Sequence, residues 1–378
     1  MTMLRCRAMM GAAILGGLAA CAVVPEPEPP RTPTPPAAAT PLPTGQVVVR
    51  ARSRWVPVDW AELPGWSADT TRELWPALQR GCDRPAPGWE GLCVAARGYA
   101  PATDADARAW LQARLRPYRV EALDGATDGL ATGYFEPLVE AQRLPRGNFR
   151  VPLHTLPDDL ASRKPWWTRQ QIDTLPAAQA ALRGRELAFV ADPLDALLLQ
   201  VQGSGRLLLA DGNGAKRQVR VAYAGHNDQP YKSVGRWLIE QGELKPEQAS
   251  WPAIKAWARA NPKRINELLW SNPRYVFFRE EALPDPNLGP KGAQAVPLTP
   301  GRSIAVDPQS VPYGTPVWLD TTEPLSSTPL RRLVMAQDTG SAITGAVRAD
   351  YFWGWGEDAE AQAGRMKQAL RMWVLWPR

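Results

Sequence analysis

Histidine and cysteine are scarce in this sequence. Its 378 residues include only two histidines, His154 and His226, and four cysteines. Neither histidine lies at the spacing of metal ligands, so we expect no metal site. The chain also lacks a run of basic residues of the kind that binds nucleic acid. Its 44 Lys and Arg against 38 Asp and Glu give a formal charge of +6, which suits an anionic cell-envelope surface and makes nucleic acid a poor candidate partner.

The apolar run near the start of the sequence, MMGAAILGGLAA, is shorter than the roughly 20 residues that a membrane-spanning helix needs. Arg5 and Arg7 precede it, as is typical of a signal peptide, here residues 1–20. The run ends at Cys21 in a pattern that is similar to the bacterial lipobox, so we expect lipidation of Cys21. An ordinary secretory signal that contains a cysteine is the alternative. By resemblance to such lipoproteins, Ala22 implies sorting to the outer membrane.

Residues 21–45 follow as an expected lipid anchor and tether. The stretch PEPEPPRTPTPPAAATPLP has many prolines and few apolar residues, so it cannot bury a core and should stay extended. A stiff spacer would let the folded body reach a periplasmic polymer away from the membrane. A passive linker without that requirement is equally compatible with the composition.

About 330 residues remain, enough for two domains or for one domain with a large insertion. Cys82 and Cys93 form an isolated pair in an oxidising compartment, which predicts a disulfide between them. Most of the seventeen tryptophans are expected in the core, including Trp110 and Trp237, which lie at helical spacing from apolar residues. The aromatic side chains of the run YFWGWG, residues 351–356, have two alternative roles, contact with a sugar or packing.

Alternating and apolar segments predict a mainly β protein with a few helices. We expect strands at 56–60, 130–135, 187–190, 197–202, 206–210, 217–223, 275–278, 303–306, 316–319, 332–336 and 372–375. Those from 197 to 223 are predicted to form an antiparallel meander. Helices are expected at 103–116, 231–240 and 252–269, the last with a break at 261–262. Asp358 is expected to cap a helix that runs toward Leu370. We find no internal repeat.

Two glycine-containing segments in the middle of the chain are candidate sugar-binding elements. Amides and hydroxyls beside glycines can hold sugar hydroxyls, because glycine lets a ligand approach the backbone closely. The candidate residues in these two segments are Thr132, Gly133, Tyr134, Gln202, Gly203, Ser204 and Gly205. The alternatives are that the second segment is a simple hairpin turn and that the nearby Glu136 is a solvated strand end.

Several motifs together resemble a known family. They are TGYFEP, QVQGSG, YAGHNDQPYKSVGRWLIEQGEL, NPRYVFF, GAQAVPLTPGRSIAVDP, VPYGTPVWLD, and AQDTGSAI followed by RADYF. In combination they are similar to the membrane-bound lytic murein transglycosylase A family, from about Thr132 to the C-terminus. The family's fold implies a double-psi β-barrel domain, here 46–136 and 284–378, with a second β-barrel domain inserted at 137–283. A saccharide groove is expected between the two domains.

The C-terminal portion resembles the family's three-aspartate domain, whose aspartates would be Asp307, Asp338 and Asp350. The resemblance implies that Asp350 is the catalytic acid and that Asp338 assists it, with Thr339 and Gly340 in the groove. The alternative for Asp338 is capping of the turn before Gly340, and we expect Asp307 to support the barrel. Before Asp350 this chain reads Arg-Ala, where a family member can have His-Phe.

The expected activity is that of a peptidoglycan lytic transglycosylase without a cofactor. It would cleave the β-1,4 bond between N-acetylmuramic acid and N-acetylglucosamine and form 1,6-anhydromuramoyl ends. One carboxyl group suffices because the C6 hydroxyl of the same muramoyl residue is the nucleophile. Asp350 must start protonated near neutral pH, which requires a raised pKa. We expect apolar aromatic neighbours and the charge of Asp338 to raise it.

Two other functions are kept open. One is a hydrolase on a related barrel that uses Asp338 as its base; the other is a non-catalytic lipoprotein that binds murein. The expected partners are peptidoglycan glycan strands and the outer membrane, with murein synthases as further candidates.

Overall fold

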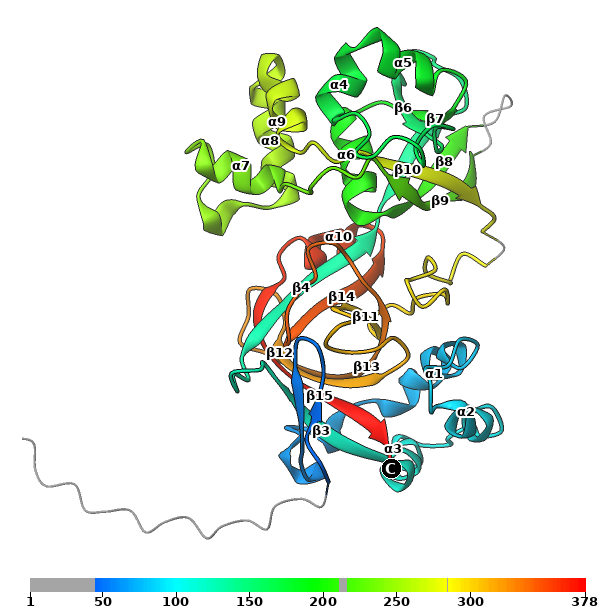
Figure 1. The fold of residues 1–378 in the computed structure, drawn as a ribbon, viewed down its shortest axis with the longest axis vertical. Helices are drawn as coiled ribbons and strands as arrows, with labels where there is room; N and C mark the ends of the chain where they lie inside the picture. Colours follow the sequence, from blue (N-terminus) through cyan, green and yellow to red (C-terminus); the bar gives the residue numbers. More distant parts are fainter. Residues whose placement is uncertain (1–44, 211–215, 284) are drawn as a thin grey trace, which may run out of the picture. The chain divides into compact units, whose positions relative to one another are not determined.

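The computed structural model describes residues 45–210, 216–283 and 285–378. The expected signal peptide, the lipidation site Cys21 and nearly all of the expected tether lie outside these residues. Within the described ranges, none of the helices combines the length and the apolar character needed to cross a membrane. The described chain is mainly β, as predicted, and its strands form two sheets (Figure 1).

The larger sheet closes into a barrel. Its strand order is β1-β2-β3-β15-β12-β13-β11-β14-β4, and β15 also pairs with β4, which joins the two sides. The barrel strands are β4 (Gly129–Glu136), β11 (Ser303–Val306), β12 (Pro316–Thr322), β13 (Pro329–Asp338), β14 (Arg348–Trp355) and β15 (Lys367–Pro377). The strands that extend the sheet are β1 (Val48–Val49), β2 (Arg54–Pro57) and β3 (Leu115–Glu121). The barrel is thus built from both ends of the described chain.

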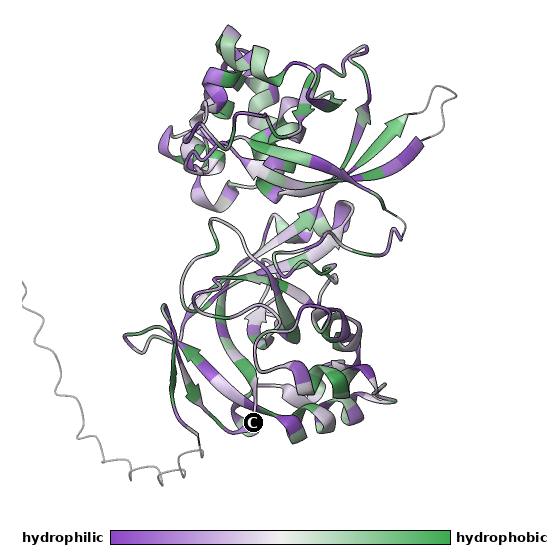
Figure 2. Cartoon of the chain, turned by 45° about the vertical axis from the view of Figure 1, so that its right-hand side comes forward, coloured by the Kyte–Doolittle hydropathy of each residue, from purple (hydrophilic) through white to green (hydrophobic). Residues whose placement is uncertain are grey.

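The smaller sheet is formed entirely by the chain between β4 and β11, so it is an insertion into the barrel domain. Its order is β10-β9-β8-β5-β7-β6, and the two edge strands, β10 and β6, contact each other. The strands are β5 (Leu138–Gln142), β6 (Val151–His154), β7 (Glu186–Val190), β8 (Ser204–Ala210), β9 (Lys216–His226) and β10 (Val276–Glu281). Both sheets contain hydrophobic stretches (Figure 2), and their buried apolar side chains form a separate core in each.

Helices cover the sheets. Of those in the described residues, three lie before the barrel strands, namely α1 (Trp75–Gly81), α2 (Glu90–Arg97) and α3 (Asp104–Arg114). The insertion contains α4 (Arg169–Thr174), α5 (Pro176–Leu182), α6 (Pro193–Gln202), α7 (Val234–Glu240), α8 (Trp251–Ala260) and α9 (Ile265–Ser271), and α10 (Glu357–Ala363) follows β14. Short 3-10 helices stand at Trp60–Glu62, Trp66–Ala68, Thr71–Leu74, Pro246–Gln248 and Pro262–Arg264.

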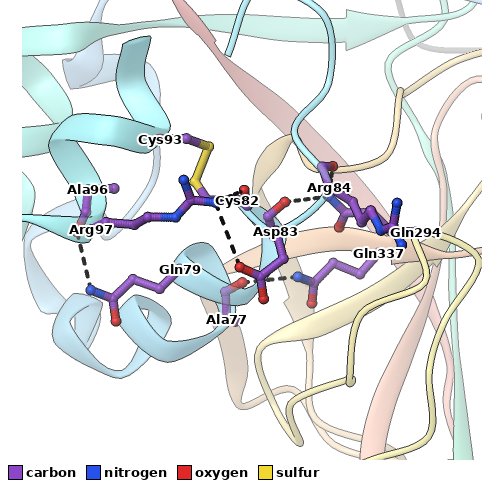
Figure 3. The surroundings of a disulfide bond; sticks show 11 residues. Ala77, Gln79, Cys82, Asp83, Arg84, Cys93, Ala96, Arg97, Gln294 and Gln337 are labelled. Carbon is purple, nitrogen blue, oxygen red and sulfur yellow. Dashed lines mark hydrogen bonds and ion pairs between the residues drawn. A yellow bond between two sulfur atoms is a disulfide. The ribbon is translucent and has the colours of Figure 1, made fainter. Parts of the chain in front are cut away.

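Tryptophans pack the first three helices onto the barrel. Trp110 of α3 is buried and meets Trp75 edge to face, with ring centroids 5.0 Å apart. Trp318 and Trp373 of the barrel belong to the same core. Such aromatic pairs contribute beyond the area that they bury, which explains much of the high tryptophan content. Close by, Cys82 and Cys93 form a disulfide between the end of α1 and α2 (Figure 3).

Most predicted elements are confirmed, several within a residue or two of their ends, but the strand predicted at 197–202 is wrong. Those residues lie in helix α6, which begins after Asp192; the Asp192 carboxylate accepts a hydrogen bond from the Leu194 amide at 2.8 Å. The helix is buried on almost every side, so its apolar run shows no helical period. The predicted meander is therefore a helix followed by the β8–β9 hairpin.

Two predicted helix ends also need correction. The helix predicted at 103–116 ends at Arg114, and strand β3 begins at the next residue, Leu115. The helix near Asp358 ends at Ala363, well before Leu370, and its N-cap residue is Gly356. Asp358 lies in its first turn, where a negative charge still suits the positive end of the helix dipole.

Glu136 is not a solvated strand end. It is completely buried where β4 leaves the barrel for the insertion, and it pairs with two buried arginines. Arg206 Nε lies 2.7 Å and Arg220 Nε lies 2.5 Å from its carboxylate oxygens. Both arginines also donate to the carbonyl of Leu288, in the segment that returns to the barrel. This network therefore joins the outgoing and the returning connections.

Candidate active site

A pocket of about 760 Å³ is lined by residues of both sheets and their loops. Most of the candidate residues from the sequence line it: Thr132, Gly133, Tyr134, Gln202, Gly203, Ser204, Asp338, Thr339, Gly340 and Asp350. Gly205 does not line it. The pocket thus brings together three segments that are about 70 and 140 residues apart in the sequence.

Asp350 lies on β14 next to Thr132 of β4, its partner in a parallel pair. Alternation along β14 places Ala349 and Tyr351 in the barrel core and Asp350 toward the pocket. The Thr132 hydroxyl donates a hydrogen bond to Oδ1 of Asp350. Arg348 Nη2 donates to the same hydroxyl oxygen at 2.9 Å. The carboxyl group is therefore held from one side while it faces the pocket.

Asp338, at the end of β13, has both carboxylate oxygens occupied. Oδ1 accepts the Ala293 amide at 3.0 Å, and Oδ2 accepts the Tyr134 hydroxyl at 3.0 Å. The Ala293 contact holds the loop at 290–293, which also lines the pocket. Asp338 thus connects two walls of the pocket through these hydrogen bonds.

The backbone around Asp338 is fixed from the α1 region (Figure 3). The side chain of Gln337, directly before Asp338, donates to the Ala77 carbonyl at 3.0 Å. Gln294 donates through its side chain to the Gly81 carbonyl and through its backbone amide to the Gln337 carbonyl, both at 3.0 Å. The N-terminal helices, with their disulfide, therefore support this wall of the pocket.

Burial raises the pKa of both pocket aspartates. For Asp350 the hydrogen bond from Thr132 and the charge of Arg348 oppose that rise in pKa without cancelling it. For Asp338 burial raises the pKa to about 6 despite hydrogen bonds from Thr339, Ala293 and Tyr134, and the charge of Asp350 adds to the rise. Desolvation is thus the main physical cause of both rises in pKa, and the charge of Asp338 is not among the causes of the rise at Asp350.

Asp338→Asn is expected to remove part of the pH dependence of folding stability. The pKa of Asp338 rises from 3.8 to about 6 on folding, so the native state binds its proton more tightly than the unfolded chain does. The contribution of Asp338 to the free energy of unfolding is fully present below pH 4 and is lost as the pH rises through about 6. Between pH 4 and 7 the wild type should therefore lose about 2 kcal/mol relative to Asp338→Asn. Urea denaturation across this range measures the difference.

The matched control for this experiment is Asp358→Asn, which changes an exposed aspartate of the same domain. It should follow the wild-type pH dependence. Parallel curves for Asp338→Asn and the wild type would contradict the raised pKa of Asp338.

The second glycine-containing segment is the C-terminal end of α6, not a hairpin turn. Gly203 has φ +80 and ends the helix in the left-handed conformation that favours glycine. Gln202 and Ser204 flank it in the pocket wall, and the Gln202 side chain accepts the Phe135 amide at 3.2 Å. At Gly205 a Cβ atom would lie 2.0 Å from a Leu199 side-chain carbon, so this glycine serves close packing.

The aromatic run at 351–356 serves packing. Tyr351 and Phe352 are buried in the protein interior. Trp353 packs against Tyr351, and the Trp355 ring lies 3.9 Å from the Arg206 guanidinium. None of these four side chains lines the pocket.

The wall contributed by the insertion contains residues that the sequence prediction missed. Tyr223, His226, Tyr231, Arg274 and Arg279 line the pocket. Tyr223 is 45% exposed, so its ring is open to solvent at the pocket wall. The signal was present, because three of these residues belong to YAGHNDQPYK and one to NPRYVFF, but pattern alone assigns them no direction.

Two family models match the chain. The MltA specific insert domain matches residues 130–279, and the 3D domain matches residues 302–376. Membrane-bound lytic murein transglycosylase A of Vibrio cholerae is 35% identical over 254 residues, which cover 65% of each chain. The chain therefore spans slightly less than two thirds of that relative. The Escherichia coli K12 protein of the same name is 32% identical over 276 residues, 71% of this chain and 72% of its own.

Solved structures agree with these matches. The lytic transglycosylase LtgG of Burkholderia pseudomallei is 47% identical, with 88% of this chain and 97% of that chain covered and a TM-score of 0.61. MltA from Neisseria gonorrhoeae is 31% identical, with 89% and 95% covered and a TM-score of 0.75. E. coli MltA with bound chitohexaose is 27% identical, with 84% and 89% covered and a TM-score of 0.61. The chain therefore belongs to the membrane-bound lytic murein transglycosylase A family.

Proposed function

We propose that this protein is a lytic transglycosylase of peptidoglycan, with Asp350 as its single catalytic carboxyl. It cleaves the β-1,4 bond between N-acetylmuramic acid and N-acetylglucosamine and leaves 1,6-anhydromuramoyl ends. The observation that carries the proposal is a carboxyl with a raised pKa that faces a pocket between two β domains. The names of the related proteins support it.

In the proposed reaction, protonated Asp350 gives its proton to the glycosidic oxygen as the bond from that oxygen to C1 breaks. The C6 hydroxyl of the same muramoyl residue adds to C1 and returns a proton to Asp350. No water is consumed and the carboxyl is regenerated. Because the nucleophile is already part of the bound sugar, no second carboxylate is needed to position it. Since Asp350 must begin protonated, kcat/KM falls as the pH rises through its raised pKa.

Asp338 is proposed to assist rather than to act as a base. Both of its oxygens already accept hydrogen bonds, from Ala293 and Tyr134. These bonds hold the carboxylate in the pocket wall, where it shapes the groove. Hydrolysis and transglycosylation are distinguished by the ends of the released fragments.

Digestion of purified murein sacculi tests the proposal. Soluble muropeptides should appear, each with the mass of an anhydro end, which is lower by one water than a reducing end. Products with reducing ends would indicate the hydrolase. Binding to sacculi without soluble products would indicate a protein that binds murein but does not cleave it.

The substrate is proposed to lie between Asp350 and the wall of the insertion. Thr132, Gly133 and Tyr134 line one side, and Gln202, Gly203 and Ser204 line another, together with Thr339 and Gly340. The E. coli relative is described with bound chitohexaose, which supports a β-1,4-linked saccharide in the corresponding pocket. Tyr223 supplies an exposed aromatic ring, on which a sugar face can pack.

Tyr223→Ala is expected to weaken binding of chitohexaose by about three- to tenfold, because the sugar loses the ring against which it packs. Tyr223→Phe keeps the ring and should bind close to wild type. Leu144→Ala, which removes another exposed apolar side chain of the insertion outside the pocket, is the control. Calorimetric titration measures the dissociation constants. Equal constants for Tyr223→Ala and Leu144→Ala would remove Tyr223 from the binding site.

We further propose an outer-membrane lipoprotein that faces the periplasm, anchored by lipid on Cys21 after removal of residues 1–20. The proposed domains are a tether at 21–45, barrel segments at 46–136 and 284–378, and the insertion at 137–283. Murein synthases are proposed as protein partners. The strands of the smaller sheet, which run from Leu138 to Glu281, support the limits of the insertion. Labelling with palmitate tests the anchor, and loss of the label in Cys21→Ser is the expected result.

A further inference from the structure

Arg348, Thr132 and Asp350 form a chain of hydrogen bonds at the edge of the pocket. Arg348 Nη2 donates to the Thr132 hydroxyl oxygen at 2.9 Å, and that hydroxyl donates to Asp350 Oδ1. Arg348 Nη1 also donates to the carbonyls of Leu130 and Ala349, at 3.3 and 2.6 Å. The guanidinium is therefore fixed by the backbone of both strands, β4 and β14.

The donors in this series of hydrogen bonds restrict which oxygen can carry each hydrogen atom. A guanidinium only donates, so Arg348 must use a lone pair of the Thr132 oxygen. Thr132 has a single O–H hydrogen, and its described hydrogen-bond partners are Arg348 and Asp350 alone. The hydroxyl hydrogen is then directed to Asp350 Oδ1. If Asp350 Oδ1 were instead protonated and donated a hydrogen bond to Thr132, the Thr132 hydroxyl hydrogen would have no acceptor among the described contacts. Such an unpaired group is costly at a partly buried site.

We propose that Arg348 is a positioning residue that acts through Thr132 to keep the acidic proton of Asp350 on Oδ2. Among the described residues, Oδ2 of Asp350 has no hydrogen-bond partner, so it is the oxygen left for the substrate. The inference rests on the proposed function, because a proton on Oδ2 matters only if Asp350 is the general acid. It explains how one carboxyl group presents the same oxygen in both proton transfers.

Other charged and titratable groups do not replace this arrangement. Asp338 on β13 and Tyr134 on β4 hydrogen-bond each other. β11 places Ala305, which cannot titrate, opposite Asp350, and β15 places Lys367, whose side chain is exposed, opposite Thr132. Within the described part of the chain, Arg274, His226 and Lys291 line the pocket but form no hydrogen bond or ion pair with Arg348 or Thr132. Among the residues that the structure describes, Arg348 alone therefore orients the hydroxyl that contacts Asp350.

The proposal predicts that Arg348 and Thr132 depend on each other. Arg348→Met lets the Thr132 hydroxyl rotate and accept a hydrogen bond from a protonated Oδ1, so kcat on the acidic plateau should fall about tenfold. Thr132→Val removes the donor to the carboxylate and should also lower the plateau about tenfold. The double variant should lose about tenfold, not a hundredfold, because neither residue positions the proton without the other. Full pH profiles of kcat on denuded glycan strands supply the plateau values.

A purely electrostatic role for Arg348 gives a different result. Removal of the cation would then shift the basic limb of the profile to higher pH and leave the plateau unchanged. Thr132→Ser restores the hydroxyl and should recover most of the activity lost in Thr132→Val, which tests the Thr132 arm even if Arg348→Met fails to fold. Arg365→Met, at an exposed arginine of the same domain, is the control for loss of charge.

Multiplicative losses in the double variant, an unchanged plateau in Arg348→Met, or no recovery in Thr132→Ser would each overturn the proposal. These outcomes are distinct from failure of the proposed function. If the wild type releases no anhydro ends, the function itself is wrong; if it releases them and the losses multiply, only the positioning role of Arg348 is wrong.

Discussion

Asp350→Asn should lower the rate of muropeptide release by about 10³-fold or more, the largest effect of any single substitution in this protein. Asparagine has nearly the same shape but cannot give up a proton to the glycosidic oxygen. Because it can still accept a hydrogen bond from Thr132, the local structure should persist. Release of soluble muropeptides from sacculi, followed by chromatography, measures the rate.

Two controls make the result specific to the acid. Binding of chitohexaose by Asp350→Asn should stay within about threefold of the wild type, because the pocket keeps its shape. Asp358→Asn, at an exposed aspartate outside the pocket, should keep full activity. Full activity in Asp350→Asn together with its loss in Asp338→Asn would transfer the role of the acid to Asp338.

Glu136→Gln is expected to have the largest effect on stability. Its carboxylate lies between Arg206 and Arg220, and all three side chains are buried. Removal of the negative charge leaves two buried guanidinium groups without an anion, which costs about 3–5 kcal/mol in the free energy of unfolding. Urea denaturation monitored by tryptophan fluorescence measures this loss in the free energy of unfolding.

The matched control is Glu140→Gln, four residues further along the chain, where the carboxylate pairs with Lys216 at the surface. An exposed pair of this kind contributes at most about 1 kcal/mol. Because the Glu136 network also holds both connections between the barrel and the insertion, Glu136→Gln should lower kcat/KM as well. A loss of stability no larger than that of Glu140→Gln would show that the network is not a structural junction.

Much of the fold is predictable from the sequence because many strands alternate or are bounded by turn residues. The strand at 303–306 is predicted with its observed ends, and those at 187–190 and 206–210 lie within two residues of theirs. Helix α6 is not predictable from the sequence pattern, because burial of nearly all of its residues removes the polar stripe that marks a helix. Its start signals, Asp192 and the proline after it, are nevertheless present in the sequence.

The candidate site is predictable only where a motif carries it. Asp338 and Asp350 follow from the resemblance, and the structure places both beside one pocket. The roles of Arg348 and Thr132 depend on the register that pairs β14 with β4, two strands more than 200 residues apart. Tyr223 on β9 and Arg274, just before β10, reach one pocket because these two strands pair in antiparallel register. Local patterns hold no information on such pairings.

The most direct test of the central claim is digestion of sacculi in water enriched in heavy oxygen. If the C6 hydroxyl of the muramoyl residue attacks C1, the released anhydro ends contain no oxygen from the solvent, and mass spectrometry should find no label in the products. Heavy oxygen at C1 of reducing muramic acid ends would contradict the account, because it would show that water, rather than the sugar itself, completes the reaction.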